Sequence, residues 1–218
     1  MQTISLISQK GGTGKTTTAI GLAVAAHLEG LRVAIIDTDP QTNAANWGDR
    51  REGEAGPEAY SCGVGQLAKV VEGARADGYD LVIIDTAGKS DTAATSAAKL
   101  ADLVLIPVQS QVFDLETLDA VKTILGMAGN PPAFVVITKA HPSTRDPVGD
   151  MAEGIKERFG LETAPVALAQ RRVYATAPET GQGPQEVDGG DKAAAELTAL
   201  FAFAKEQHSK TAKLQKRA

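Results

Sequence analysis

Short apolar runs rich in valine and isoleucine recur along the chain, and longer helix-like stretches separate them. The apolar positions within each run are nearly continuous rather than alternating, as expected of strands that are covered on both faces. This pattern predicts strands at residues 3–8, 32–37, 80–85, 102–108, 133–138 and 163–168. Helix caps and apolar residues at helical spacing predict helices at residues 15–29, 64–76, 114–127 and 192–206.

Strands that alternate with helices require crossover connections, which favour a mainly parallel, twisted sheet with helices on both faces. The sequence therefore predicts an α/β fold, with a single domain over residues 1–206 and a basic, frayed tail over residues 207–218. Two polar stretches that contain glycine and proline depart from the alternation, at residues 49–63 and 175–190. We expect the second to be a mobile loop that becomes ordered when a ligand or partner binds.

Composition narrows the class of protein. Of 218 residues, 43% are hydrophobic and 22% are charged, which is typical of a globular protein. The single cysteine, Cys62, excludes a disulfide framework and a metal cluster of cysteines, and it favours a reducing compartment. The N-terminus has no basic region of the kind found in signal peptides, and no apolar run reaches the roughly 18 to 20 residues that span a bilayer. We therefore expect a cytoplasmic protein.

The stretch SQKGGTGKTT, residues 8–17, lies between the first predicted strand and the first predicted helix. A glycine-rich turn at a helix N-terminus presents backbone N–H groups to an anion with no side chains in the way. Lys15 can reach the β- and γ-phosphates of a nucleotide, and Thr16 offers a hydroxyl to Mg²⁺. The combination favours a phosphate-binding loop over a glycine turn with an incidental lysine.

Three aspartates stand where predicted strands end, which is where a metal bound to a nucleotide would need carboxylates. Asp37 and Asp39 end one strand, and Asp85 ends another after an apolar run. Single aspartates at strand ends commonly cap the next helix, and that alternative stays open for each of them. Their number, in a sheet that opens with a phosphate loop, favours a metal site. Gly88, after DTA, would let the backbone approach a γ-phosphate and act as a switch.

The motifs QKGGTGKTT, IIDTDPQTNAANW, VIIDTAG and LIPVQSQVFDLETL together resemble those of the ParA-type deviant Walker ATPases, which position plasmids, chromosomes and other large cargo in bacteria. The resemblance runs from Thr3 to about Leu200, and QRRVYATA at residues 170–177 is similar to the C-terminal part of the small partition ATPases. Because Met1 begins the first strand, the chain resembles the short form without an N-terminal helix-turn-helix. The resemblance implies a P-loop NTPase fold, with ATP and Mg²⁺ as cofactors.

The same resemblance implies roles for single residues. Lys10 would cross the interface of an ATP-dependent homodimer to touch the nucleotide of the partner, and Asp39 would orient the attacking water. The implied catalytic residues are Lys10, Lys15 and Asp39, and the implied metal-site residues are Thr16, Asp37 and Asp85. The implied nucleotide-binding residues are Lys10, Gly11, Gly12, Thr13, Gly14, Lys15, Thr16, Thr17, Thr138 and Lys139, the last two near the adenine.

ParA-type dimers bind DNA without sequence preference, so the resemblance implies a nucleoid-associated protein. The formal net charge is −5, but residues 205–218 hold five cations and one glutamate, which leaves −9 on the rest of the chain. Such binding would therefore come from a local basic patch. The candidate DNA-binding residues are Arg171, Arg172, Lys205, Lys210, Lys213, Lys216 and Arg217. A lysine-rich end that only aids solubility is the alternative.

The resemblance also implies a centromere- or cargo-binding adaptor of the ParB type, whose basic segment would stimulate hydrolysis. Two other classes stay open. A Min-type ATPase that binds membranes would end in an amphipathic helix, for which the tail offers only Leu214 as a large apolar residue, so we expect no membrane partner. A metabolic P-loop ATPase would use the same loop, but Lys10 and the DPQ motif fit it less well.

Overall fold

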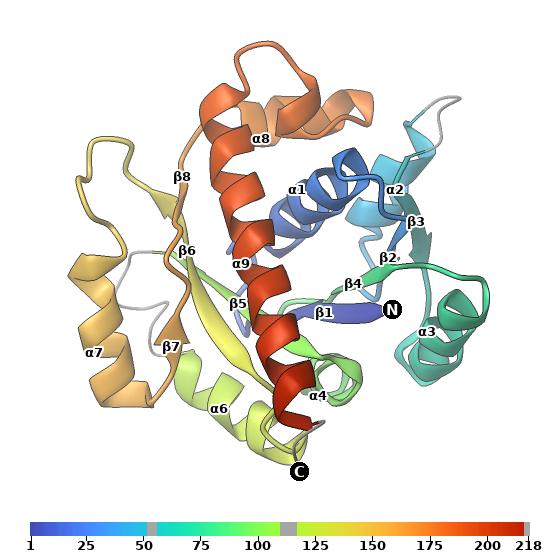
Figure 1. Ribbon diagram of the computed structural model, residues 1–218, viewed down its shortest axis with the longest axis horizontal. Coiled ribbons are helices and arrows are strands. Elements are labelled where there is room, and N and C mark those ends of the chain that lie inside the picture. Colours follow the sequence, from blue (N-terminus) through green and yellow to red (C-terminus); the bar gives the residue numbers. More distant parts are fainter. Residues whose placement is uncertain (52–55, 110–116, 216–218) are drawn as a thin grey trace.

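The computed structural model describes residues 1–51, 56–109 and 117–215, with side chains described as far as residue 210. In this part of the chain one sheet of eight strands has the order β3-β2-β4-β1-β5-β6-β7, and β8 pairs with β6 (Figure 1). All of these pairs are parallel. The strands are β1 (Gln2–Leu6), β2 (Val33–Asp37), β3 (Glu58–Ser61), β4 (Leu81–Asp85), β5 (Leu103–Gln109), β6 (Ala133–Ala140), β7 (Glu162–Thr163) and β8 (Leu168–Ala169).

Helices cover both faces of the sheet (Figure 1). The α-helices are α1 (Lys15–Leu28), α2 (Asn43–Asp49), α3 (Leu67–Ala76), α4 (Asp91–Leu100), α6 (Leu118–Met127), α7 (Gly149–Phe159), α8 (Val173–Thr176) and α9 (Asp191–Gln215). Short 3₁₀ helices are η1 (Val64–Gln66), η2 (Ala177–Thr180) and η3 (Pro184–Glu186). Helices α1, α2 and α9 share one hydrophobic cluster, whereas α3, α4, α6 and α7 contribute to two clusters of other strand residues.

Strand β4 shows why the central strands are continuously apolar. Leu81 and Ile83 belong to the cluster that includes α1 and α9, whereas Val82 and Ile84 belong to the cluster that includes α3. All four side chains are buried. Successive residues of a strand point to opposite faces, so a sheet with helices on both faces needs apolar residues at every position.

Most of the predicted elements are confirmed. Five of the six predicted strands are present, with ends that differ by no more than two residues, and the predicted α/β fold with a parallel sheet is correct. The helices predicted at residues 15–29 and 64–76 are α1 and the pair η1 and α3. The helix predicted from residue 114 is α6, which is described from Leu118, and residues 114–116 lie outside the described residues.

One expected element is wrong. The strand expected at residues 163–168 is replaced by two separate two-residue strands, β7 and β8. The polar stretch at residues 49–63, where no strand was predicted, contains β3, which pairs with β2 at the edge of the sheet. The stretch at residues 175–190 contains the end of α8, η2 and η3, and its expected mobility stays a prediction. The pattern also did not predict α2, α4 or α7.

Helix α9 continues to Gln215, nine residues beyond the end predicted for the last helix at residue 206. It packs closely on α1, because Gly21 of α1 leaves room for the side chain of Leu197. A β-carbon on residue 21 would lie only 2.4 Å from the nearest carbon of Leu197. No helix in the described ranges is long and apolar enough to cross a membrane.

Two phenylalanines of α9 offer a matched test of this packing. Phe201 is 1% exposed within the cluster shared with α1, whereas Phe203 is partly buried and meets the Phe134 ring edge-on at 5.0 Å. We expect Phe201→Ala to lower the free energy of unfolding by about 3–5 kcal/mol, and Phe203→Ala to lower it by clearly less. Urea unfolding followed by circular dichroism measures both values. Equal losses would contradict the packing described for α9.

Candidate functional site

The phosphate loop connects the end of β1 to the start of α1. Gly12 and Gly14 have φ angles of +75° and +95°, which favour glycine, and α1 begins directly after Gly14. Gln109 Nε2 donates a hydrogen bond to the Gly12 carbonyl at 2.8 Å, and Thr138 Oγ1 donates to the Thr13 carbonyl at 2.7 Å. Side chains at the ends of β5 and β6 therefore bind two carbonyl oxygens of the loop, whose N–H groups at a helix N-terminus suit an anion.

Lys15 is buried inside this loop with 7% of its surface exposed. Its Nζ atom donates to Ser8 Oγ at 3.1 Å and to the Lys10 carbonyl at 3.4 Å. Burial lowers the pKa of Lys15, and the charges of Asp85 and Asp39 raise it. The amine is held by neutral oxygens close to carboxylates, in a place where an incoming phosphate would supply a full negative charge.

Thr16 and Asp85 form the candidate metal site. Thr16 Oγ1 donates to Asp85 Oδ2 at 2.6 Å, and the buried Asp85 Oδ1 has no hydrogen-bond partner in the described structure. Burial raises the pKa of Asp85 to about 7, against the lowering effect of the Thr16 hydrogen bond. A hydroxyl beside a carboxylate with a free oxygen is a hard-oxygen set, and it fits a Mg²⁺ ion that keeps several of its waters.

Asp37, the other aspartate expected in the metal site, binds backbone N–H groups. Its Oδ1 atom accepts from the Asp39 N–H at 2.9 Å, and its Oδ2 atom accepts from the N–H groups of Ala44 and Ala45 at 2.9 and 3.3 Å. The carboxylate thus caps the first turn of α2, which is the alternative that the sequence left open. Its place in the metal site stays a prediction.

Asp39 lies between the end of β2 and α2. It is only partly buried, and its Oδ1 atom accepts from the Gln41 N–H at 2.9 Å. Its charge raises the pKa of both Lys15 and Asp85, so its carboxylate lies near the phosphate loop. This position is compatible with a carboxylate that orients water at a γ-phosphate.

Gly88 brings the DTAG segment against the phosphate loop. A β-carbon there would lie 3.2 Å from the Gly11 nitrogen and 3.3 Å from Gly11 Cα, so a larger residue would push the two segments apart. The partly exposed Lys10 belongs to the same contact, because its carbonyl carbon would be 3.4 Å from that β-carbon. Gly88 therefore lies against the loop itself, and its expected approach to a γ-phosphate stays a prediction.

A cavity of about 280 Å³ adjoins the phosphate loop on the side of β6 and β8. The expected adenine residues Thr138 and Lys139 line it, and Lys139 has a φ of +50° where the pairing of β6 with β8 is irregular. The sequence did not assign the opposite wall, which is formed by Leu168, Ala169, Gln170, Arg171, Tyr174 and Ala175. The QRRVYATA motif was the available signal, since most of these residues belong to it.

The candidate DNA-binding residues do not form one set. Arg171 donates to Glu196 Oε1 through Nη2 at 2.5 Å and Nε at 3.1 Å, and Tyr174 and the Ala169 N–H bind the other oxygen, so Arg171 belongs to the cavity wall. Arg172 is exposed. Lys205 pairs with Glu29, and Lys210 pairs with Glu206 at 2.9 Å in exposed ion pairs. The side chains of Lys213, Lys216 and Arg217 lie outside the described residues.

A parallel sheet, a glycine loop before α1 and a partly buried Thr16–Asp85 pair define a nucleotide-binding α/β protein of the P-loop class. A family model described as the CobQ/CobB/MinD/ParA nucleotide binding domain matches residues 4–184. The chain belongs to this family, which confirms the resemblance that its motifs carry.

Named relatives agree with this assignment. The maintenance of carboxysome distribution protein A of Gloeobacter kilaueensis is 29% identical over 157 residues, which are 71% of each chain. Protein ParA of Rhizobium radiobacter is 29% identical over 218 residues, covering 94% of this chain and 96% of the relative. The crystal structure of the Pyrococcus furiosus cell division ATPase MinD has a TM-score of 0.77 at 18% identity, over 94% of this chain and 98% of that chain. At 18% identity, the similarity to this MinD structure concerns the fold alone.

The raised pKa of Asp85 predicts how stability depends on pH. The folded state keeps a proton on Asp85 up to about pH 7, whereas the unfolded chain releases it near 3.8. The metal-free protein should therefore lose stability from this group as pH rises from about 4 to 7, by a few kcal/mol at most. Asp85→Asn imitates the protonated acid, so it should match the wild type at pH 4 and exceed it at pH 8. Urea unfolding at both pH values, without Mg²⁺, checks this. An equal difference at both pH values would contradict it.

Proposed function

We propose that the protein is a Mg²⁺-dependent ATPase that positions DNA or another large cargo, and that ATP binding closes it into a sandwich dimer. The observation that carries the proposal is the phosphate loop with two lysines. Lys15 is buried inside the loop, while Lys10 lies partly exposed where the DTAG segment meets it. The names of the relatives, which refer to carboxysome distribution and to ParA, support a positioning role.

The proposed chemistry needs positioning more than covalent steps. The amide groups of the loop and Lys15 would bind the phosphates, and the partly exposed Asp39 would orient the attacking water. Thr16 and Asp85 would hold Mg²⁺ through its water shell, and the ion would neutralise charge on the phosphate oxygens. Lys10 of one protomer would contact the phosphates bound by the other, so hydrolysis would remove a contact that holds the dimer together.

The proposal includes non-specific DNA and a basic, ParB-type adaptor as partners, which would place the protein in the cytoplasm at the nucleoid. Arg172 is an exposed cation directly before α8, and Lys205 and Lys210 make exposed ion pairs. Exposed pairs contribute little stability, so these cations can exchange partners for phosphates. A Min-type membrane role and a metabolic role remain the alternatives.

The dimer is tested with three variants in Mg²⁺ and a non-hydrolysable ATP analogue. Each charge-assisted contact from Lys10 contributes about 1.5–3 kcal/mol, so Lys10→Ala should weaken dimerisation by about 10- to 100-fold while the nucleotide still binds. Lys15→Ala should lose nucleotide binding itself. With ATP in place of the analogue, Asp39→Ala should stay dimeric, because it binds ATP and cannot hydrolyse it, whereas the wild type should return to monomers. Light scattering after gel filtration measures the mass. A Lys10→Ala protein that dimerises like the wild type would refute the sandwich.

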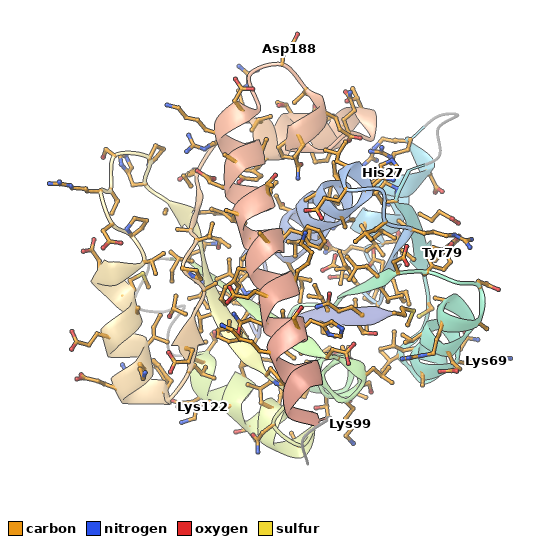
Figure 2. The ribbon with its side chains drawn as sticks, in the orientation of Figure 1. His27, Lys69, Tyr79, Lys99, Lys122 and Asp188 are labelled. Atoms are coloured by element: carbon orange, nitrogen blue, oxygen red, sulfur yellow. The ribbon has the colours of Figure 1, made fainter. Side chains whose placement is uncertain are left out.

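DNA binding by the ATP-loaded protein should depend steeply on salt. Phosphate contacts release counterions, so the affinity for a random duplex should fall at least on the order of tenfold between 50 and 200 mM salt. Arg172→Ala should reduce the slope of log affinity against log salt by about one. The exposed Lys69 on α3 (Figure 2) is the control, and Lys69→Ala should leave the slope unchanged. Fluorescence anisotropy measures these affinities. Equal affinity at both salt concentrations would contradict electrostatic binding, and sedimentation with anionic vesicles in place of DNA would favour the Min-type alternative.

A further inference from the structure

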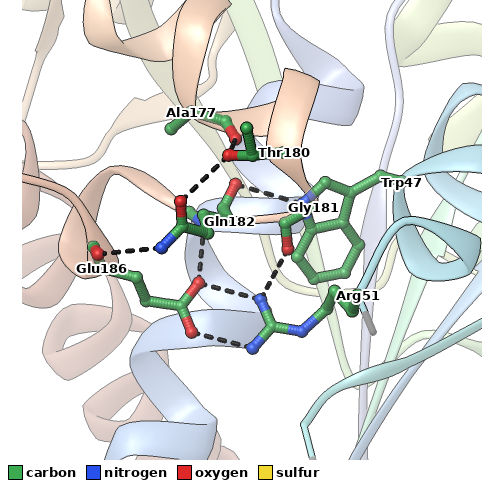
Figure 3. A network of polar contacts seen from close by, with 8 residues as sticks. Trp47, Arg51, Ala177, Thr180, Gly181, Gln182 and Glu186 are labelled. Atoms are coloured by element: carbon green, nitrogen blue, oxygen red, sulfur yellow. Dashed lines mark hydrogen bonds and ion pairs between the residues drawn. The ribbon is translucent and has the colours of Figure 1, made fainter. Parts of the chain in front are cut away.

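Residues 177–186, which the sequence presents as a mobile loop, are fastened to the end of α2 by a polar network (Figure 3). Glu186 accepts from both terminal nitrogens of Arg51 at 2.8 Å and from the Gly183 N–H at 2.7 Å. Arg51 also donates to the Gly181 carbonyl at 2.8 Å, and Trp47 Nε1 donates to the Gln182 carbonyl at 3.1 Å. We call Trp47, Arg51 and Glu186, with the backbone of residues 181–183, the α2 clamp.

The α2 clamp is buried and tightly fitted. Trp47 is fully buried, and the side chains of Arg51 and Glu186 are 10% and 18% exposed. A β-carbon at Gly181, whose φ is +71°, would lie 2.6 Å from the carbonyl carbon of Arg50, so only glycine allows this approach. A bidentate pair that is largely removed from water is far stronger than the exposed ion pairs of the same structure.

At its N-terminal end, α2 is joined to the loop that contains Asp37 and Asp39. The Asp37 carboxylate caps α2, and the Thr42 N–H donates to the Asp39 carbonyl at 2.9 Å. Thr42 has a φ of +50°, a conformation that costs a β-branched residue about 1 kcal/mol or more and persists only where the surroundings impose it. Since α2 has only seven residues, roughly 10 Å of helix separates this strained link from the α2 clamp.

The clamped segment also continues the wall of the cavity beside the phosphate loop. Gln170, Arg171 and Tyr174 line that cavity, and α8 leads from them directly into η2. Glu196 of α9 fixes Arg171 and Tyr174, and the Gln185 side chain donates to the Gly21 carbonyl of α1 at 2.7 Å. The cavity wall and the Asp37–Asp39 loop are therefore joined through the α2 clamp and through the chain that runs from α8 into η2.

We propose that the Arg51–Glu186 pair is a positioning pair for ATP hydrolysis. It holds α2, and with it Asp39, in a fixed position relative to the cavity wall. A nucleotide base bound in the cavity would therefore also fix the position of the Asp37–Asp39 loop. The inference rests on the proposed ATPase function. Neither Arg51 nor Glu186 lines the cavity beside the phosphate loop. Loosening the pair frees the strained Thr42 link and moves Asp39, while the phosphate loop and the cavity still bind ATP.

The kinetic test uses Glu186→Gln and Arg51→Lys, the latter keeping the charge but losing the planar fork. A misplaced Asp39 should lower kcat for ATP on the order of ten- to a hundredfold with KM little changed. Glu162→Gln is the matched control, since it breaks the exposed Lys156–Glu162 pair of equal length and should keep the wild-type kcat. Urea unfolding shows which variants are folded. If Glu186→Gln does not fold, Arg51→Lys provides the test.

The emission of Trp47, the only tryptophan, reports on the α2 clamp directly, because the Arg51 guanidinium lies 5.0 Å from its ring centre. ADP should shift this emission in the wild type, whereas pyrophosphate, which has the same phosphates and no base, should leave it nearly unchanged. The shift should be lost in folded Glu186→Gln.

A folded Glu186→Gln or Arg51→Lys protein with the wild-type kcat would overturn the inference, as would equal emission shifts with ADP and pyrophosphate. An unchanged emission in wild-type protein shown by calorimetry to have bound ADP would overturn it too. A wild-type protein that neither binds ADP nor hydrolyses ATP would instead overturn the proposed function, and this inference with it.

Discussion

The burial of charge at one edge of an apolar sheet is the constraint on which the site depends. Lys15 at the start of α1 and Asp85 at the end of β4 are both removed from water, and within the described residues no ion pair joins them to each other or to another side chain. Buried charges of this kind are unfavourable, and only a rigid framework keeps them in place. Here the framework is a sheet apolar on both faces, which leaves the strand ends as the place for polar groups. A bound triphosphate with Mg²⁺ would supply the missing counter-charges.

Those parts of the fold and site that depend on local pattern could be predicted from the sequence. The five long strands are recognisable because most of their positions are apolar in nearly continuous runs, and the phosphate loop because Gly12 and Gly14 must adopt positive φ angles. The edge strand β3 was not predicted, because a strand at the exposed edge of a sheet needs no continuous apolar run. The opposite wall of the cavity was not predicted, because it is formed by β8 and α8. The pattern of apolar residues does not show that these elements lie beside β6.

The roles of single polar residues were harder to predict than the elements that carry them. Asp37 and Asp85 end neighbouring strands in register, yet three backbone N–H groups occupy the oxygens of Asp37, whereas one oxygen of Asp85 has no partner among the described residues. Arg171 looks like a surface cation in the sequence, but Glu196 on a distant helix binds it. In both cases the deciding partner comes from the tertiary fold, so charge and spacing alone cannot assign the role.

Glycine and proline in residues 175–190 illustrate the same point for the backbone. Their abundance suggests a flexible loop, because glycine adds conformational freedom to an unfolded chain. In the folded protein, Gly181 and Gly183 are instead the positions where a side chain would collide with α2 and α1, so they allow a close contact rather than motion. A segment that must touch α2 on one side and continue the cavity wall on the other needs small residues at its contacts. The close contacts of this segment with α1 and α2 therefore explain its glycine content, and mobility is not required to account for it.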